Sequence, residues 1–214
     1  MVGLRRRWVL AHFSLGVIAA SASGLARAAD APVVLVVGDS LSAEYGLKAG
    51  DGWVALLQQR LTEQKKPYRV VNASISGDTT SGGRSRLPAA LRTHKPAIVI
   101  IELGGNDALR GLPLSSTRDN LQAMTKAAQD AGAKVLIAGM QVPPNYGAAY
   151  GKEFAGLFEQ VAKQAHTAFV PFLLKGVADR ADAMDWFQPD RIHPLAKAHP
   201  LVLDNVWPAL KPLL

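Results

Sequence analysis

The sequence predicts an α/β fold in which a parallel β-sheet is covered by helices. From Pro32 onward, short runs rich in Val, Ile and Leu alternate with longer amphipathic stretches. Two of the runs, Val33–Val37 and Ile98–Ile101, are apolar at every position. Such runs are typical of strands that are buried on both faces, so these two strands belong at the centre of the sheet.

Five strands are predicted in chain order: Val33–Val37, Arg69–Asn72, Ala97–Glu102, Lys134–Gly139 and Phe169–Phe172. The stretches around them predict five helices: Trp53–Gln64, Arg84–Thr93, Thr117–Ala131, Phe154–Ala165 and Ala196–Leu210. One long segment without a pattern runs from Leu173 to Pro194. Long loops in compact domains are often functional, so this segment is a candidate for the site.

The N-terminal segment has the pattern of a secretory signal. Three arginines, Arg5–Arg7, precede an apolar stretch over residues 8–22, and Ala26–Ala28 has the small-x-small pattern of a cleavage site. A membrane anchor is the alternative, but the apolar stretch is shorter than the roughly 18 residues that a spanning helix needs. We therefore predict a signal peptide over residues 1–29, one domain over residues 30–214, and a periplasmic or secreted protein.

Composition excludes several classes of function. The predicted signal holds four arginines and no acidic residue, so its removal lowers the formal net charge from +7 to +3. A mature chain with that charge and no Lys/Arg run lacks the basic face expected of a nucleic-acid-binding protein. The absence of cysteine excludes disulfides, thiolate metal sites and a cysteine nucleophile.

Candidate functional residues follow the first three predicted strands. In open parallel sheets, ligands bind at the carboxyl ends of the strands, where the strand order reverses. The segments at those ends are Gly38–Ser42, Ala73–Asp78 and Leu103–Asp107. If the strand order is 2-1-3-4-5, the first strand lies between the second and third, and Ser40 is flanked by Gly77 and Asn106.

A serine hydroxyl becomes a nucleophile when a base takes its proton and a third group orients that base. Four of the five histidines lie in the predicted signal or on or near predicted helices: His12, His94, His166 and His199. The fifth, His193, lies on a loop, and Asp190 precedes it by three residues. We predict Ser40 as the nucleophile, His193 as the base and Asp190 as the orienting acid.

Acyl transfer also needs donors for the oxyanion that forms in the transition state. The backbone N–H groups of Ser40 and Gly77 and the side-chain amide of Asn106 could supply them. The structural alternative is that Gly77 and the pair Gly104 and Gly105 are turn residues and that Asn106 caps a helix. We adopt the turn interpretation for Gly104 and Gly105.

Other polar residues near this edge have structural interpretations. Asp39 adjoins Ser40 in sequence, so its carboxylate points elsewhere on the turn, and we predict that it braces the loop. Arg84, Arg86 and Arg110 could attract anionic head groups. Scattered arginines are usually solvated, and we predict that role for all three.

Four sequence blocks resemble the SGNH (GDSL) hydrolase family, which is named for a Ser, a Gly, an Asn and a His. They occur in the family's order: Gly38–Ser42, Gly77–Thr79, Gly104–Asp107 and Asp190–Pro194. The similarity extends over nearly the whole mature chain to the bacterial multifunctional acyl-thioesterase, lysophospholipase and arylesterase subgroup. It includes three further stretches: Val71–Thr79, Glu102–Asp107 and Pro143–Gly147.

The resemblance implies a flavodoxin-like three-layer α/β/α fold with a five-stranded parallel sheet in the order 2-1-3-4-5. It implies a serine esterase that cleaves esters or thioesters of monoacyl substrates, lysophospholipids included, through an acyl-serine intermediate and without a metal or cofactor. No nucleic-acid partner and no stable membrane insertion are expected, and a monomer is the expected state. Glu44 departs from the subgroup's usual small residue and is expected to alter the pocket rim.

Three alternative functions are weighed against this one. A carbohydrate deacetylase could use the same fold and triad, and a panel of acyl chain lengths would separate it from a lipid esterase. A non-catalytic acyl-binding protein would need a broken triad, whereas all four block residues are present. A nucleotide-binding protein is disfavoured because no Gly-rich phosphate-binding motif follows the first strand. The preferred acyl length and leaving group are not fixed by the sequence.

Overall fold

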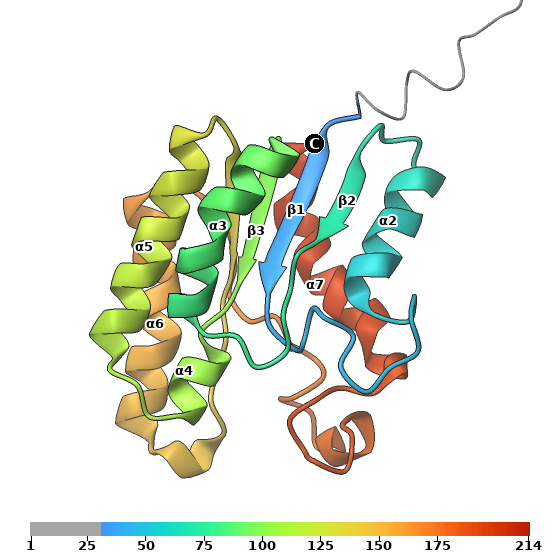
Figure 1. The fold of residues 1–214 in the computed structure, drawn as a ribbon. Coiled ribbons are helices and arrows are strands. Elements are labelled where there is room, and N and C mark those ends of the chain that lie inside the picture. Colours follow the sequence, from blue (N-terminus) through green and yellow to red (C-terminus); the bar gives the residue numbers. More distant parts are fainter. Residues whose placement is uncertain (1–30) are drawn as a thin grey trace, which may run out of the picture. The chain divides into compact units, whose positions relative to one another are not determined.

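A five-stranded parallel sheet forms the centre of the chain, which a computed structural model describes over residues 31–214 (Figure 1). The strands are β1 (Val33–Gly38), β2 (Arg69–Asn72), β3 (Ile98–Glu102), β4 (Lys134–Ala138) and β5 (Ala168–Val170). Their order is β2-β1-β3-β4-β5, and every neighbouring pair is parallel. The predicted fold class and strand order are confirmed. The predicted signal peptide, residues 1–29, lies outside the described residues.

Helices cover both faces of the sheet. They are α2 (Trp53–Glu63), α3 (Thr80–His94), α4 (Gly105–Leu109), α5 (Leu114–Asp130), α6 (Ala148–Gln164) and α7 (His199–Leu210). Short 3₁₀ helices are η1 (Pro144–Tyr146), η2 (Ala183–Trp186), η3 (Ala196–Ala198) and η4 (Lys211–Leu213). One layer holds α3, α5 and α6 side by side, and the other holds α2 beside α7 (Figure 1). No helix in residues 31–214 is long and apolar enough to span a bilayer.

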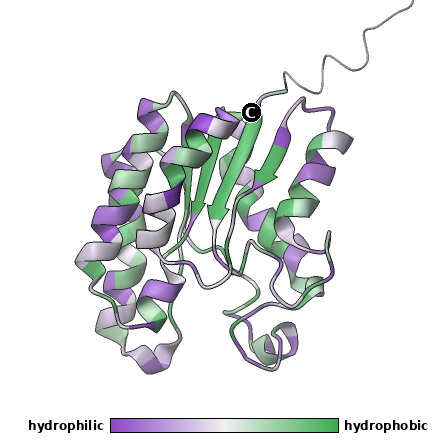
Figure 2. Cartoon of the chain, in the orientation of Figure 1, coloured by the Kyte–Doolittle hydropathy of each residue, from purple (hydrophilic) through white to green (hydrophobic). Residues whose placement is uncertain are grey.

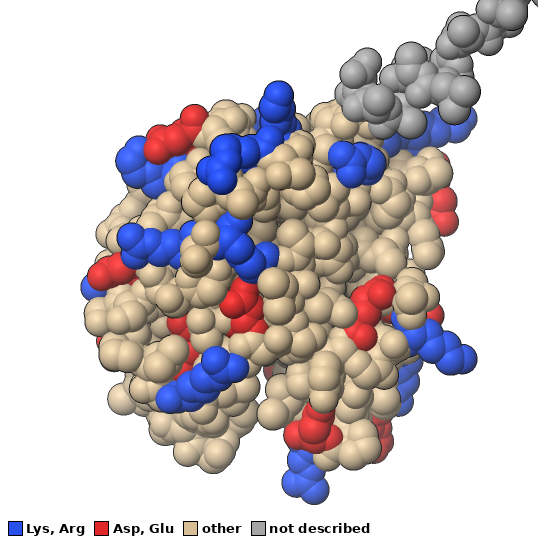
Figure 3. All heavy atoms as spheres, in the orientation of Figure 1, with Lys and Arg blue, Asp and Glu red and all other residues tan. Residues whose placement is uncertain are grey.

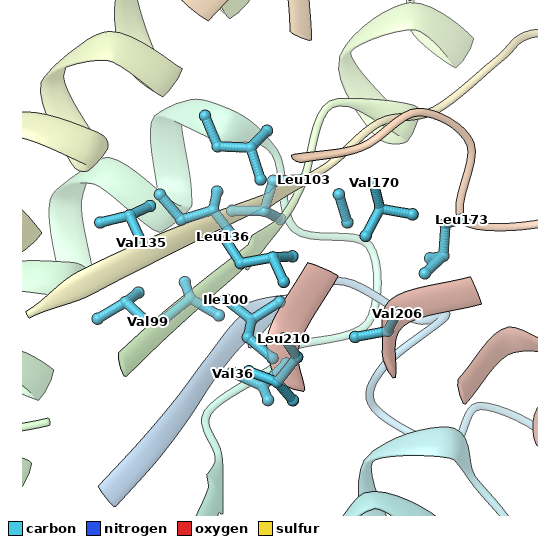
Figure 4. Packing of buried hydrophobic residues seen from close by; sticks show 14 of the residues in the cluster. Val36, Val99, Ile100, Leu103, Val135, Leu136, Val170, Leu173, Val206 and Leu210 are labelled. Carbon is cyan, nitrogen blue, oxygen red and sulfur yellow. The ribbon is translucent and has the colours of Figure 1, made fainter. Parts of the chain in front are cut away.

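The core lies between the sheet and these helices. Every residue of β1 and β3 is buried, as the continuous apolar runs predict. The sheet is accordingly the most hydrophobic part of the chain, while the helices expose hydrophilic positions (Figure 2). Figure 4 shows Val36 of β1 beside Leu210 of α7, and Ile100, Leu136 and Val206 belong to the same apolar cluster.

Helix α3 begins at Thr80, four residues before the predicted start at Arg84. The side chain of Thr79 caps it by accepting a hydrogen bond from the backbone N–H two residues after Thr80. Two glycines in the first turn conceal this start in the sequence. Glycine at 83 has a packing reason, because a Cβ there would lie 2.2 Å from Cδ1 of Leu103. It lets the helix pack closely against the end of β3.

The other differences concern β5 and four helix starts. Strand β5 begins and ends earlier than the predicted Phe169–Phe172, and α7 begins three residues after the predicted Ala196, because residues 196–198 form η3. Helix α4 was not predicted, because Gly104 and Gly105 were interpreted as turn residues. Gly104, at φ 123°, precedes the helix as its N-cap, but Gly105 is the first helical residue, so the turn interpretation is wrong for Gly105. Helices α5 and α6 begin at Leu114 and Ala148, three and six residues earlier than predicted. The first turns of these helices carry little apolar periodicity, so the sequence pattern starts late.

Candidate active site

The segments that follow β1, β2 and β3 lie at one edge of the sheet. Beyond the strands, the backbone N–H of Ile75 donates to the carbonyl oxygen of Gly38 at 3.0 Å, so the segment after β2 runs alongside the end of β1. Ser40 lies on the turn after β1, and Asn106 lies on α4 directly after β3. The long loop between β5 and α7 brings His193 to the same edge.

Ser40, His193 and Asp190 form one continuous chain of hydrogen bonds. The Oγ of Ser40 lies 2.8 Å from Nε2 of His193, and Nδ1 of His193 lies 2.7 Å from Oδ2 of Asp190. The other carboxylate oxygen, Oδ1, accepts from the backbone N–H groups of Ile192 at 2.9 Å and His193 at 3.0 Å. The structure thus brings together the three residues predicted as nucleophile, base and orienting acid.

The charge of Asp190 fixes the tautomer of His193. Partial burial would raise the pKa of Asp190, but the hydrogen bonds from the backbone and ring of His193 and from the backbone of Ile192 outweigh it and lower the pKa to about 2. An ionised carboxylate can accept but not donate. Nδ1 of a neutral His193 therefore carries the ring hydrogen, and its bare Nε2 faces the hydroxyl of Ser40, as a general base requires.

Gln188 connects the histidine loop to the nucleophile loop. Its backbone N–H donates to the carbonyl oxygen of His193 at 2.7 Å, and its Nε2 donates to the carbonyl oxygens of Tyr45 at 2.9 Å and Pro194 at 3.2 Å. The Tyr45 and His193 rings lie with their centroids 4.3 Å apart. Sequence reasoning missed Gln188 and Tyr45, since the hydrogen bond that joins them spans 143 residues of the chain. The unpatterned loop was the one signal that pointed to this region.

Gly77 and Asn106 occupy the two segments on either side of Ser40. Gly77 has a φ of 78°, a left-handed conformation that glycine adopts without a steric penalty. Its carbonyl oxygen accepts from Nη2 of Arg110 at 2.8 Å. The N-cap of α4 is Gly104, and Asn106 lies inside the helix, so the interpretation of Asn106 as a helix cap is wrong. Its Nδ2 donates instead to Oδ2 of Asp39 at 3.1 Å.

Two buried carboxyl groups lie beneath the nucleophile turn. Oδ1 of Asp39 accepts from the backbone N–H of Leu41 at 3.0 Å, which agrees with the prediction that Asp39 braces the turn. Oε2 of Glu102 accepts from the hydroxyl of Ser42 at 2.6 Å and from the backbone N–H of Asp39 at 3.3 Å. Asp39 is 3% exposed and Glu102 is fully buried. The turn that carries Ser40 is therefore held by two carboxyl side chains.

Burial raises the pKa of both carboxyls. Desolvation raises the pKa of Asp39 to about 6, although hydrogen bonds from Leu41 and Asn106 and the charge of His193 oppose the rise. Desolvation, with the negative charge of Asp39, raises the pKa of Glu102 well above its usual range. A carboxyl with a pKa of about 6 is still mostly ionised at neutral pH, so Asp39 can accept hydrogen bonds there as a carboxylate.

The three arginines differ in their surroundings. Arg84 and Arg110 are exposed, as predicted. The solvated interpretation is wrong for Arg86, whose side chain is 22% exposed and donates to Oδ2 of Asp78 at 2.7 Å and to the carbonyl oxygens of Gly38 at 3.2 Å and of Ala73. It ties the end of β1 to the segment after β2. On the face in Figure 3, Lys and Arg are interspersed with Asp and Glu.

Glu44 holds its own loop. Its φ is 59°, and its carboxylate accepts from the backbone N–H groups of Gly50 at 3.1 Å and Gly52 at 2.9 Å. The expected influence of Glu44 on the pocket rim would therefore be exerted through the path of the loop that carries Tyr45.

His199, excluded as the base, is buried, and its Nδ1 accepts from the backbone N–H of residue 53 at 3.1 Å. Burial lowers the pKa of His199.

A Ser-His-Asp chain at the carboxyl edge of a parallel α/β sheet places the protein in the class of serine hydrolases. The chain belongs to the GDSL-like lipase/acylhydrolase family, whose model matches residues 36–201. It is 54% identical over 190 residues to "Esterase TesA" of Pseudomonas aeruginosa, covering 89% of this chain and 93% of the relative. It is 39% identical over 187 residues to "Thioesterase 1/protease 1/lysophospholipase L1" of Escherichia coli K12, covering 87% of each.

Solved structures show the same relationship. A structure described as "Crystal Structure of TesA" superimposes with a TM-score of 0.82 at 54% identity and covers 85% of this chain and 99% of its own. The chain is thus an enzyme of the carboxylic ester hydrolase type.

Proposed function

We propose that this protein hydrolyses carboxylic esters and thioesters of monoacyl substrates through an acyl intermediate on Ser40. The observation that carries the proposal is the unbroken hydrogen-bond chain from Ser40 through His193 to Asp190, with distances of 2.8 and 2.7 Å. An aligned base is what converts a weakly nucleophilic hydroxyl into an effective one. The relatives named esterase and thioesterase support the same reaction class.

In the proposed reaction, Oγ of Ser40 attacks the acyl carbon while Nε2 of His193 takes the hydroxyl proton. Asp190 stabilises the imidazolium that forms. The negative oxygen of the tetrahedral intermediate is met by the backbone N–H groups of Ser40 and Gly77 and by the amide of Asn106. His193 then protonates the departing alcohol or thiol, and a water molecule, deprotonated by the same nitrogen, releases the acid and restores Ser40.

The surroundings of this edge support an apolar acyl substrate. Seven large apolar side chains are exposed in residues 31–214, and all lie in segments between the carboxyl end of a strand and the next main helix: Tyr45, Ile75, Leu109, Leu112, Tyr146, Met184 and Ile192. Apolar groups gathered near a polar reaction centre suit a substrate with a fatty chain and a polar ester. Acyl-thioesters, lysophospholipids and aryl esters all fit this description.

The reaction is tested by the hydrolysis of p-nitrophenyl esters from acetate to palmitate, a long-chain acyl thioester and a lysophospholipid. We expect turnover of chains longer than acetyl, and we expect Ser40→Ala and His193→Ala to abolish it. His166→Ala, which changes a histidine away from this edge, is the control and should retain activity. Activity restricted to acetyl esters would favour the carbohydrate deacetylase, and full activity of Ser40→Ala would contradict the proposal.

We also propose export to the periplasm or the medium, with cleavage of the signal peptide after Ala28 or Ala29. The support is the sequence pattern of the N-terminal segment. Intact-mass measurement of the exported protein should give a chain that begins at Ala29 or Asp30. Exported protein that retains Met1 would contradict this proposal.

A further inference from the structure

The side-chain amide of Asn106 has a defined orientation, and Asp39 sets it. A carboxylate accepts hydrogen bonds and cannot donate them when ionised, so the group that Asn106 presents to Oδ2 of Asp39 at 3.1 Å has to be its NH₂. The NH₂ group carries two hydrogens, and this contact uses one of them. The second remains free for another acceptor.

The orientation matters because the two ends of an amide have opposite polarity. A rotation of about 180° would exchange the NH₂ group for the carbonyl oxygen, and an oxygen lone pair would then face the developing oxyanion. We propose that Asp39 is a positioning residue, whose carboxylate holds the amide of Asn106 in the orientation that donates to the oxyanion. This inference rests on the function proposed above for Asn106.

Asp39 is itself held firmly enough for this role. Its Oδ1 accepts from the backbone N–H of Leu41 at 3.0 Å, and its own backbone N–H donates to Glu102 at 3.3 Å. The residue is buried, so water does not compete for its oxygens. Since Oδ1 accepts from a backbone donor, the carboxylate cannot turn away from Asn106 without leaving the buried N–H of Leu41 unpaired.

The substitution Asp39→Asn tests the inference because it keeps the shape and removes one acceptor. The new side chain has one oxygen and one NH₂ group for two positions that both face donors. If the new NH₂ group faces the N–H of Leu41, two donors meet there and no hydrogen bond forms. If it faces Asn106, the amide of Asn106 has to rotate so that its carbonyl oxygen accepts from the new NH₂ group. We expect kcat to fall about 10- to 100-fold with KM changed less than about threefold, since the lost contact strengthens as the oxyanion forms. An influence of the Asp39 charge by repulsion alone would instead raise kcat.

A double-mutant cycle separates positioning from a general role in the turn. In an Asn106→Ala background, which has no amide to orient, Asp39→Asn should lower kcat less than about threefold further. Ser42→Ala is the matched control, since it removes a buried hydrogen bond from the same turn without contacting Asn106. If Ser42→Ala lowers kcat, its fold-decrease and that of Asn106→Ala should multiply in the double variant. Thermal melts accompany each variant, and Asp39→Ala enters the same cycle if Asp39→Asn does not fold.

The outcomes distinguish this inference from the proposed function. Full multiplication of the Asp39→Asn and Asn106→Ala losses would overturn the positioning role and leave the oxyanion role of Asn106 intact. An unchanged or increased kcat of Asp39→Asn would overturn it as well. An unchanged kcat of Asn106→Ala would remove Asn106 from the oxyanion hole, and the positioning role of Asp39 would fall with it.

Discussion

The substitution Asp190→Asn should abolish most of the activity while it preserves the shape of the site. Oδ1 of Asp190 faces two backbone donors, the N–H groups of Ile192 at 2.9 Å and His193 at 3.0 Å. In Asp190→Asn, the amide oxygen has to take the position of Oδ1, because an NH₂ group at that position would face two N–H donors and could accept from neither. The NH₂ group then faces Nδ1 of His193, which must become the acceptor. The ring hydrogen moves to Nε2, where it opposes the hydroxyl of Ser40 and removes the base.

The expected loss is large because the wrong tautomer removes general-base catalysis almost completely. An isosteric Asp to Asn change in a triad of this kind lowers kcat about 10⁴-fold, which corresponds to about 5.5 kcal/mol of activation free energy. The assay is the steady-state hydrolysis of a p-nitrophenyl ester, with nitrogen NMR of His193 to identify the protonated ring nitrogen. Asp185→Asn makes the same chemical change in the same loop, outside the triad, and should leave kcat unchanged.

The difference in melting temperature between Asp190→Asn and the wild type should also depend on pH. The pKa of Asp190 is lowered to about 2 from an ordinary value of 3.8, so the carboxylate stabilises the native state above pH 3.8, and this contribution is lost as the pH falls toward 2. Asp190→Asn should therefore melt below the wild type at pH 6, and the gap should narrow between pH 4 and pH 2. Activity of Asp190→Asn within tenfold of the wild type, or an unprotonated Nε2 in its spectrum, would refute the tautomer reasoning.

Three further expectations follow from named contacts. A fluorophosphonate should label Ser40 once, as peptide mapping would show, and equal labelling of another serine would reassign the nucleophile. Asn106→Ala should lower kcat by about 10²–10³ with little change in KM. Asn106→Asp should lower kcat at least as much, because an ionised carboxylate cannot donate a hydrogen bond and would repel the oxyanion; an active, stable Asn106→Asp enzyme would exclude the oxyanion role. Gly83→Ala should lower the melting temperature, because its methyl group would lie 2.2 Å from a leucine carbon, whereas Gly156→Ala, with open space at an exposed helical position, should raise it; equal shifts would contradict the packing argument.

The sheet could be predicted closely because its signal is local and strong. Runs such as Val33–Val37 have to be buried on both faces, and that requirement fixes their place at the centre. Helix starts were predicted less well, because glycines conceal those of α3 and α4 and the first turns of α5 and α6 carry little apolar periodicity. Gly83 and Gly105 look like breakers in the sequence, but one permits close packing and the other opens a short helix. The structural role of such a glycine depends on which residues pack against it in the fold, and the sequence alone does not show them.

At the site, sequence reasoning reached the residues whose chemistry is distinctive. Ser40, His193 and Asp190 were selected because a nucleophile needs a base and an orienting acid, and their catalytic roles remain predictions. The supporting contacts could not be predicted in the same way. Gln188 bonds to a backbone carbonyl 143 residues away, and Arg86 braces a strand end although isolated arginines are usually solvated.

The buried carboxyls beneath Ser40 show why such support carries a cost in stability. Burial raises the pKa of Asp39 from 3.8 to about 6, so the native state binds more protons than the unfolded chain in that interval. The contribution of Asp39 to stability therefore decreases as the pH rises from about 4 to 6, and near neutral pH the protein folds with a buried negative charge. A packed apolar residue would avoid this cost, but it could not accept from Leu41 and Asn106 together. The ionised carboxylate is thus a destabilising choice for the fold and a suitable one for an amide that has to donate to an oxyanion.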